Sequence, residues 1–180
     1  MRILICYATT EGQTRKICRF CADQLVAHGE SVEMLPAAEA AEIDLAPFDA
    51  AILAGSVHVG RLQPVLAEFA EEHAGALNRM PTLLVMVSLA IAGEDAGDRA
   101  ELDRIAESFA QETGWHPARV EHVAGAFRFT EYDFFRSLAM RWIAWRKGQQ
   151  VDPHEDREYT DWAALAARLK GWPEAPPAPE

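Results

Sequence analysis

Three threonines flank a glycine near the N-terminus, in the segment Thr9-Thr10-Glu11-Gly12-Gln13-Thr14. The segment follows a short apolar run and leads into a stretch with helical periodicity. Backbone N–H groups in a turn at the start of a helix converge on one point, where the helix dipole adds positive potential. Threonine hydroxyls supply further donors, so we predict that this loop binds a phosphate group without a positively charged side chain.

The loop lacks the signatures of two well-known nucleotide sites. It has no lysine, which a nucleoside-triphosphate loop requires after glycine, and the chain has no G-x-G-x-x-G dinucleotide fingerprint. The threonines around Gly12 fit the phosphate of flavin mononucleotide (FMN) instead. The candidate FMN-binding residues of the loop are Thr9, Thr10, Glu11, Gly12, Gln13 and Thr14. The alternative is an ordinary capping turn, since threonine is a common helix cap.

Five apolar runs alternate with helix-like stretches and predict the scaffold that positions this loop. The runs are Arg2 to Tyr7, Ser31 to Leu35, Asp49 to Ala54, Thr82 to Ser88 and Val120 to Ala126. This alternation is typical of an α/β domain with a doubly wound, five-stranded parallel sheet and helices on both faces. The second run is the least apolar and predicts an edge strand. Helices are expected at about 13–28, 64–77, 99–113 and 160–171, within one domain of residues 1–172 and before a proline-rich extended tail at 173–180.

Two further loops are expected to lie beside the phosphate loop. In a doubly wound sheet of order 2-1-3-4-5, ligands bind beyond the carboxyl ends of the strands, where the strand order reverses. The loops after the third and fourth runs therefore supply further candidate FMN-binding residues: Ser56, Val57, His58, Val59 and Gly60, and Ser88, Leu89 and Ala90. Neither loop contains tryptophan or tyrosine, so we expect one ring face to be open to a second flat molecule.

His58 has two interpretations at this place. It could contact substrate and tune the flavin or relay a proton, or it could be a loop histidine with an incidental hydrogen bond. Its residue type and position leave both open.

Composition excludes several classes of protein. The 180 residues carry a formal net charge of −11, which argues against general nucleic-acid binding. The N-terminal apolar run is too short for a signal peptide and no run approaches a membrane span, so we expect a cytoplasmic protein with reduced cysteines at Cys6, Cys18 and Cys21. For the Cys18-x-x-Cys21 pair, core packing is favoured over a redox pair or a zinc site, and no metal site is predicted.

A long insertion, at about 128–158, interrupts the alternating plan after the fifth run. Within it, Phe134 to Lys147 reads as an amphipathic helix with aromatic residues on one face and basic residues on the other. Such a helix suits the carboxylates of an anionic substrate or the headgroups of an acidic membrane. The alternative is a helix that packs its aromatic face onto the domain core.

Four segments carry a resemblance to a known family over nearly the whole chain. The loop from Thr9 to Thr14, with the strand order, carries a general likeness to flavodoxins. The narrower match is carried by Trp115-His116-Pro117-Ala118-Arg119, Ala124-Gly125-Ala126-Phe127-Arg128-Phe129 with the long insertion after it, and Tyr159-Thr160-Asp161-Trp162. With them the sequence resembles the flavodoxin-type, menaquinone-dependent protoporphyrinogen IX dehydrogenases of bacterial haem synthesis. It departs from that family at Ser88, where asparagine is usual, at Val59, where an aromatic residue is usual, and in an acidic stretch at Glu94, Asp95 and Asp98. These departures bear on the identity of the substrate more than on the binding of FMN.

The resemblance implies a flavodoxin-like fold, FMN, and oxidation of protoporphyrinogen IX to protoporphyrin IX with electrons passed to a membrane quinone. Arg128 and Arg136 are then candidates for binding substrate carboxylates, and 128–147 is a candidate for peripheral contact with the inner face of the cytoplasmic membrane. Whether the protein forms a homo-oligomer stays open. Three alternatives remain: a flavodoxin-type electron carrier, a quinone reductase fed by NAD(P)H, and a non-enzymatic interaction module.

Overall fold

The computed structural model describes residues 1–92, 96–127 and 157–172. Five strands form one all-parallel sheet in the order β2-β1-β3-β4-β5. Their bounds are β1 Arg2–Tyr7, β2 Ser31–Pro36, β3 Ala50–Ser56, β4 Thr82–Ser88 and β5 Arg119–Ala124. The prediction of a doubly wound α/β sheet is confirmed, with β2 at an edge.

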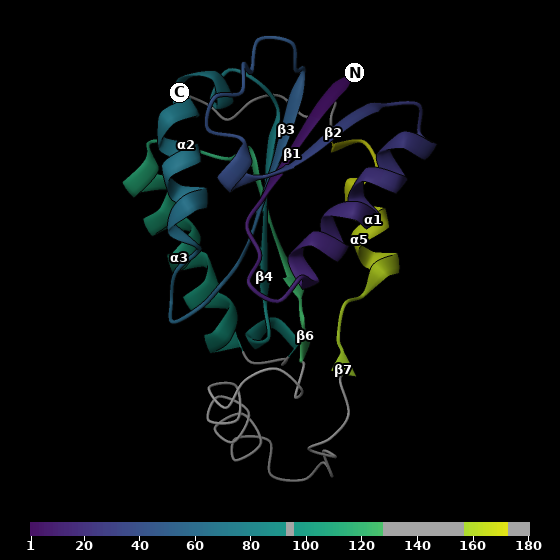
Figure 1. The fold of residues 1–180 in the computed structure, drawn as a ribbon. Coiled ribbons are helices and arrows are strands. Elements are labelled where there is room, and N and C mark those ends of the chain that lie inside the picture. The colour runs from purple at the N-terminus through teal and green to yellow at the C-terminus, as the bar shows by residue number, and fades with distance from the viewer. Residues whose placement is uncertain (93–95, 128–156, 173–180) are drawn as a thin grey trace, which may run out of the picture.

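Helices cover both faces of the sheet (Figure 1). One face carries α1 (Gln13–Ala27) and α5 (Trp162–Leu169), and the other carries α2 (Pro64–Leu77) and α3 (Ala96–Thr113). Because successive side chains of a strand point to opposite faces, Leu4 and Cys6 of β1 enter the core under α2 and α3, while Ile3 and Ile5 enter the core under α1 and α5. The apolar runs thus form two hydrophobic cores, one on each face of the sheet, which fix the positions of the strand ends.

Most helix ends agree with the sequence signals. Helix α2 begins at Pro64 and ends at Leu77 as expected, and the Asp161 side chain caps α5 by accepting a hydrogen bond from the Ala164 N–H (2.9 Å). Helix α3 differs, since it begins at Ala96, three residues before the expected start. Two short 3₁₀ turns, Ala37–Glu39 and Ala90–Ala92, follow β2 and β4.

The fifth apolar run is not one strand, which corrects the expected span of Val120 to Ala126. Strand β5 ends at Ala124, and β6 (Ala126–Phe127) pairs antiparallel with β7 (Arg157–Glu158). The break follows from β4, whose last residue, Ser88, accepts the Gly125 N–H (3.0 Å) before the chain turns away. Beyond Gly125 the sheet offers no further partner on β4, so β6 pairs with β7. We call this pair of short strands the stem; in the sequence its strands flank residues 128–156, which lie outside the described residues.

All three cysteines are buried in the core as expected. Burial raises the pKa of Cys6 and of Cys21 to about 12, and raises the pKa of Cys18 well above its usual value. The thiols are therefore protonated packing groups at neutral pH.

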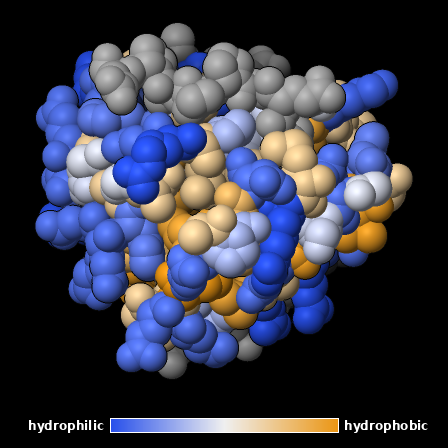
Figure 2. Space-filling view, turned by 90° about the horizontal axis from the view of Figure 1, so that it is seen from above, coloured by the Kyte–Doolittle hydropathy of each residue, from blue (hydrophilic) through white to orange (hydrophobic). Residues whose placement is uncertain are grey.

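The amino end of the sheet carries paired polar groups. The N-terminal ammonium pairs with Glu30, the Arg2 N–H donates to Asp49 (2.7 Å), and the Arg2 guanidinium pairs with Glu33 (3.0 Å). Figure 2 looks onto this end, where hydrophilic side chains surround the apolar surface. Among the described residues, no helix has the length and apolar character needed to cross a membrane.

Candidate functional site

A cavity of about 360 Å³ lies at the opposite, carboxyl end of the sheet. Its walls come from the loops after β1, β3 and β4, from the junction of β5 with β6, and from α3. It is the place where the strand order reverses between β1 and β3, as the ligand site of a doubly wound sheet requires.

Most of the candidate cofactor residues line this cavity. Those that do are Thr9, Glu11, Gln13, Thr14, Ser56, Val57, His58, Gly60, Ser88, Leu89 and Ala90. Thr10, Gly12 and Val59 belong to the same loops but do not line the cavity. Arg128, Arg136 and the 128–147 segment lie outside the described residues.

The loop after β1 has the geometry of an anion cradle. Gly12 immediately precedes α1 at φ 86°, and its N–H donates to the Thr9 hydroxyl (2.9 Å), which closes the turn. Glycine has no side chain with which to cap the helix, and the first turn of α1 carries no acidic residue. The N–H groups of that turn have no partner within the helix, so they are available to an anion. The cradle therefore fits a phosphate group.

The loop after β3 is a tight turn with an unusual conformation. His58 and Arg61 exchange two backbone hydrogen bonds (2.9 and 3.2 Å), and between them Val59 and Gly60 have φ values of 49° and 76°. The left-handed region costs a residue with a side chain about 1–2 kcal/mol, and a β-branched residue is rare there. The Val59 side chain is 85% exposed and gains no packing in return.

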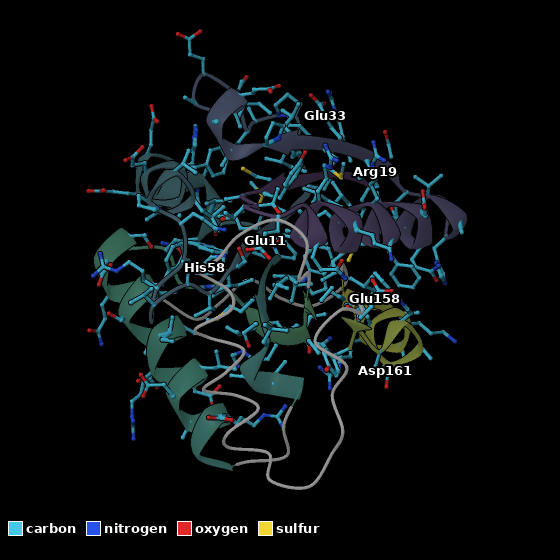
Figure 3. The ribbon with its side chains drawn as sticks, turned by 60° about the horizontal axis from the view of Figure 1, so that its bottom comes forward. Glu11, Arg19, Glu33, His58, Glu158 and Asp161 are labelled. Carbon is cyan, nitrogen blue, oxygen red and sulfur yellow. The ribbon has the colours of Figure 1, made fainter. Side chains whose placement is uncertain are left out.

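A side-chain network fixes the start of this turn. Gln63, the residue before α2, accepts the Ser56 N–H through Oε1 (3.1 Å) and donates to the Ser56 hydroxyl through Nε2. The Ser56 hydroxyl also contacts His58 Nε2 (3.0 Å). This hydrogen bond is compatible with both interpretations of His58, a functional residue and a loop histidine with an incidental contact. Figure 3 shows His58 at the same end of the sheet as Glu11 of the phosphate loop.

Helix α3 supplies a wall that the sequence reasoning missed. Its lining residues are Asp98, Glu101, Leu102 and Ile105, and the other missed ones are Val87, Gly125 and Ala126. The spacing of the four α3 residues places them on one helix face, which is a signal that the sequence contained. Glu11, Asp98 and Glu101 contribute carboxylates, and none of the described lining residues is lysine or arginine.

Comparison with known proteins places this architecture in a family. The model of the family described as Flavodoxin domain matches residues 4–154. The chain belongs to the flavodoxin domain family. Membership implies a flavin cofactor and an oxidoreductase role, which agrees with the cradle and the cavity at the strand reversal.

Two relatives of this flavodoxin domain carry the same name, protoporphyrinogen IX dehydrogenase (quinone). The one from Escherichia coli K12 is 27% identical over 92% of this chain and 91% of its own length. The one from Leishmania major is 26% identical over 91% of this chain and 71% of its own length. Among solved structures, a short-chain flavodoxin associated with a bacterial microcompartment matches with a TM-score of 0.55 at 12% identity over 96% of each chain. Megasphaera elsdenii flavodoxin matches with a TM-score of 0.53 at 18% identity over 67% of this chain and 84% of its own; both likenesses concern the fold.

The stem is attached to the phosphate loop of this flavodoxin domain. Gln13 Nε2 donates to Glu158 (2.8 Å) and to the Thr160 hydroxyl (3.1 Å), and Lys16 pairs with Glu158 (2.7 Å). Partial burial alone would raise the pKa of Glu158, but hydrogen bonds from Lys16 and Gln13 and the Lys16 charge outweigh it, so the pKa is lowered. Strand β7 is thus fixed directly beside the cradle.

Proposed function

We propose that this protein is an FMN-dependent protoporphyrinogen IX dehydrogenase that passes electrons to a membrane quinone. The observation that carries the proposal is the similarity to dehydrogenases of that name over nine-tenths of this chain. The flavodoxin fold and the cavity at the strand reversal support it.

The residues present fit FMN. The N–H groups of the turn around Gly12 would hold the phosphate, and the loops that contain Ser56 and Ser88 would flank the ring. Bound FMN would supply the two-electron redox chemistry. The protein would bind the substrate beside the open face of the ring, orient it and exclude water.

Charge restricts how a substrate can enter the cavity. The carboxylates of Asp98 and Glu101 on α3 repel anionic groups, so the substrate propionates should point away from α3. Arg128 directly follows β6 and Arg136 lies further along the same segment, and we assign both to propionate binding.

Anaerobic reduction of the FMN-loaded protein by protoporphyrinogen IX tests the proposal. We expect loss of the visible absorbance of the oxidised flavin, and its recovery when a quinone is added. Flavin that stays oxidised with protoporphyrinogen would rule the activity out. NAD(P)H is the comparison donor, and it should leave the absorbance unchanged.

Arg128→Ala tests the assigned propionate contact. It should raise the apparent KM for protoporphyrinogen about ten-fold or more, since a charge-assisted hydrogen bond contributes about 1.5–3 kcal/mol. Arg19→Ala is the matched control, because Arg19 is exposed on α1 and does not line the cavity (Figure 3). An unchanged KM in Arg128→Ala would withdraw the role of Arg128.

We also assign peripheral membrane contact to the 128–147 segment, because its net charge is positive in a chain of net charge −11. Co-sedimentation with vesicles that contain anionic lipid should weaken several-fold in Arg136→Glu, since each cation near such a surface contributes about 1 kcal/mol. Arg19→Glu changes the charge equally on α1 and should bind as the unaltered protein does. Equal binding by all three proteins would contradict the assignment.

The second candidate function is a flavodoxin-type electron carrier, which the net charge of −11 favours. A carrier would exchange electrons with a protein partner and would not be reduced by protoporphyrinogen. The anaerobic reduction experiment therefore separates the two functions.

A further inference from the structure

The side chain of Gln13 has a fixed direction, which its contact with Thr160 determines. The Thr160 hydroxyl lies 2.6 Å from the carbonyl oxygen of Ala124, and a carbonyl only accepts, so the hydroxyl donates its one proton there. Thr160 Oγ1 can then only accept from Gln13, so the amide atom that faces it (3.1 Å) is the donor, Nε2. Nε2 also donates to the carboxylate of Glu158 (2.8 Å). Both N–H donors of this buried amide are therefore used within the chain.

The segment that accepts from Gln13 holds one wall of the cavity. Residues 158–160 run beside residues 124–126, at the junction of β5 with β6. Three contacts join the two segments: the Ala126–Glu158 pair of the stem, the hydrogen bond from the Tyr159 N–H to the Gly125 carbonyl (3.1 Å), and the hydrogen bond from the Thr160 hydroxyl to the Ala124 carbonyl (2.6 Å). Gly125 and Ala126 line the cavity, so the position of residues 158–160 sets the position of this wall.

Gln13 is part of the phosphate cradle as well. It directly follows Gly12 as the first residue of α1, and it lines the same cavity. Its backbone N–H belongs to the helical turn whose N–H groups have no partner within the helix. We propose that Gln13 is a positioning residue that fixes the distance between the cradle, through its backbone, and the wall at Gly125 and Ala126, through its side chain.

Gln13 carries this link more than the neighbouring ion pair does. Lys16 also pairs with Glu158, but the two side chains are 55% and 32% exposed, and water weakens such a pair. Gln13 is 8% exposed, so water does not readily replace the hydrogen bonds of its amide. Removal of the amide should therefore loosen the wall more than removal of the Lys16 charge.

The link has a consequence for a ligand that occupies both parts of the site. FMN has a phosphate for the cradle and a flat ring for the cavity, so the cradle and the wall must keep a fixed spacing for both to be bound at once. This consequence rests on the proposed function, whereas the link between cradle and wall does not.

Amide hydrogen exchange of the flavin-free, full-length protein tests the link directly. In Gln13→Ala, the Gly125 and Tyr159 amides should exchange about ten-fold faster, the effect of one lost hydrogen bond on local opening. The Val57 N–H, which donates to the Val87 carbonyl (2.8 Å) in another wall of the cavity, should exchange as before. Equal acceleration of all three amides would indicate a general loss of stability and would overturn the proposal, as would unchanged rates at Gly125 and Tyr159.

Titration with FMN and with riboflavin, which lacks the phosphate, tests the consequence for the ring. Gln13→Ala should weaken both flavins by a similar factor of about ten, because the wall serves both. Gly12→Ala distorts the cradle and should weaken FMN more than riboflavin. Gln111→Ala is the matched control, since this glutamine is exposed on α3 and its loss should change neither affinity. Weaker FMN binding with unchanged riboflavin binding in Gln13→Ala would mean that Gln13 serves the phosphate alone, which would overturn the proposal.

A second variant reaches the same link from the other side. Should Gln13→Ala fail to fold, Thr160→Val removes the hydroxyl that joins Gln13 to Ala124 and should give the same exchange pattern. Native exchange rates in Thr160→Val would also overturn the proposal. An unaltered protein that binds neither flavin would refute the proposed function, while the flavin-free exchange rates would still decide whether Gln13 holds the wall.

Discussion

At the amino end of the sheet, Arg2 is bonded through its backbone to Asp49 and through its side chain to Glu33, and its guanidinium also lies 5.0 Å from the centre of the Phe48 ring. At the carboxyl end, Gly12 leaves the first N–H groups of α1 uncapped, and Val59 occupies a strained, exposed position. The first end pairs these polar groups of Arg2 within the chain, whereas the second keeps donors available beside the cavity at the strand reversal. We infer from this difference that the carboxyl end is organised for a ligand at some cost in stability.

The largest expected effect is a difference in FMN binding between alanine substitutions of two glycines, one at each end of the sheet. Gly12 and Gly29 have φ values of 86° and 93°, and a Cβ at either would meet no atom within 4 Å. Alanine should therefore destabilise the fold equally at both places, by about 1–2 kcal/mol, through backbone strain alone. Only Gly12→Ala should also weaken FMN binding, about ten-fold or more, because distorting the cradle loses a hydrogen bond to a charged group.

FMN fluorescence titration and urea unfolding of both variants measure the two quantities. Equal FMN affinity in Gly12→Ala and Gly29→Ala would contradict the idea that the turn around Gly12 holds the phosphate. A loss of affinity in both would show that the effect follows from stability and not from the site.

A smaller effect is expected at Val59. Val59→Gly should raise the free energy of unfolding by about 1 kcal/mol, because it removes left-handed strain from a residue that is 85% exposed. Val26→Gly is the control at an exposed valine inside α1, where glycine should lower stability by about 0.5–1 kcal/mol. Changes of opposite sign in urea unfolding would support strain at the carboxyl end, and loss of stability in both variants would refute it.

The sequence predicted the scaffold well because its signals are local. Apolar runs marked all five strands, and Pro64 and Asp161 marked helix starts that the structure confirms. The cofactor loops could be placed because the carboxyl ends of parallel strands must meet at one edge. The assignment of FMN contacts to individual residues stays a prediction.

Other features depend on contacts between distant segments. The break at Gly125 arises because β4 ends at Ser88, and the wall formed by α3 depends on how that helix lies over the sheet. The Gln63 network needs the space left by Gly55, which no periodicity reveals. Arg128 and Arg136 lie outside the described residues, so their roles rest on the resemblance and the proposed function.

The smallest expected effect concerns the stem, where an ion pair between Lys16 and Glu158 lies at the carboxyl end of the sheet. The Lys16 and Glu158 side chains are 55% and 32% exposed, so their pair should contribute at most about 1 kcal/mol. Because the pKa of Glu158 is lowered in the folded protein, this stabilisation is present above the unfolded value of about 4.5 and is lost as the pH falls through the folded value. Glu158→Gln should therefore unfold more easily than the unaltered protein at neutral pH, with a difference that vanishes in acid. A double-mutant cycle with Lys16→Met isolates the pair, and additive effects at neutral pH would mean that the ion pair adds no stability beyond the Gln13 hydrogen bonds.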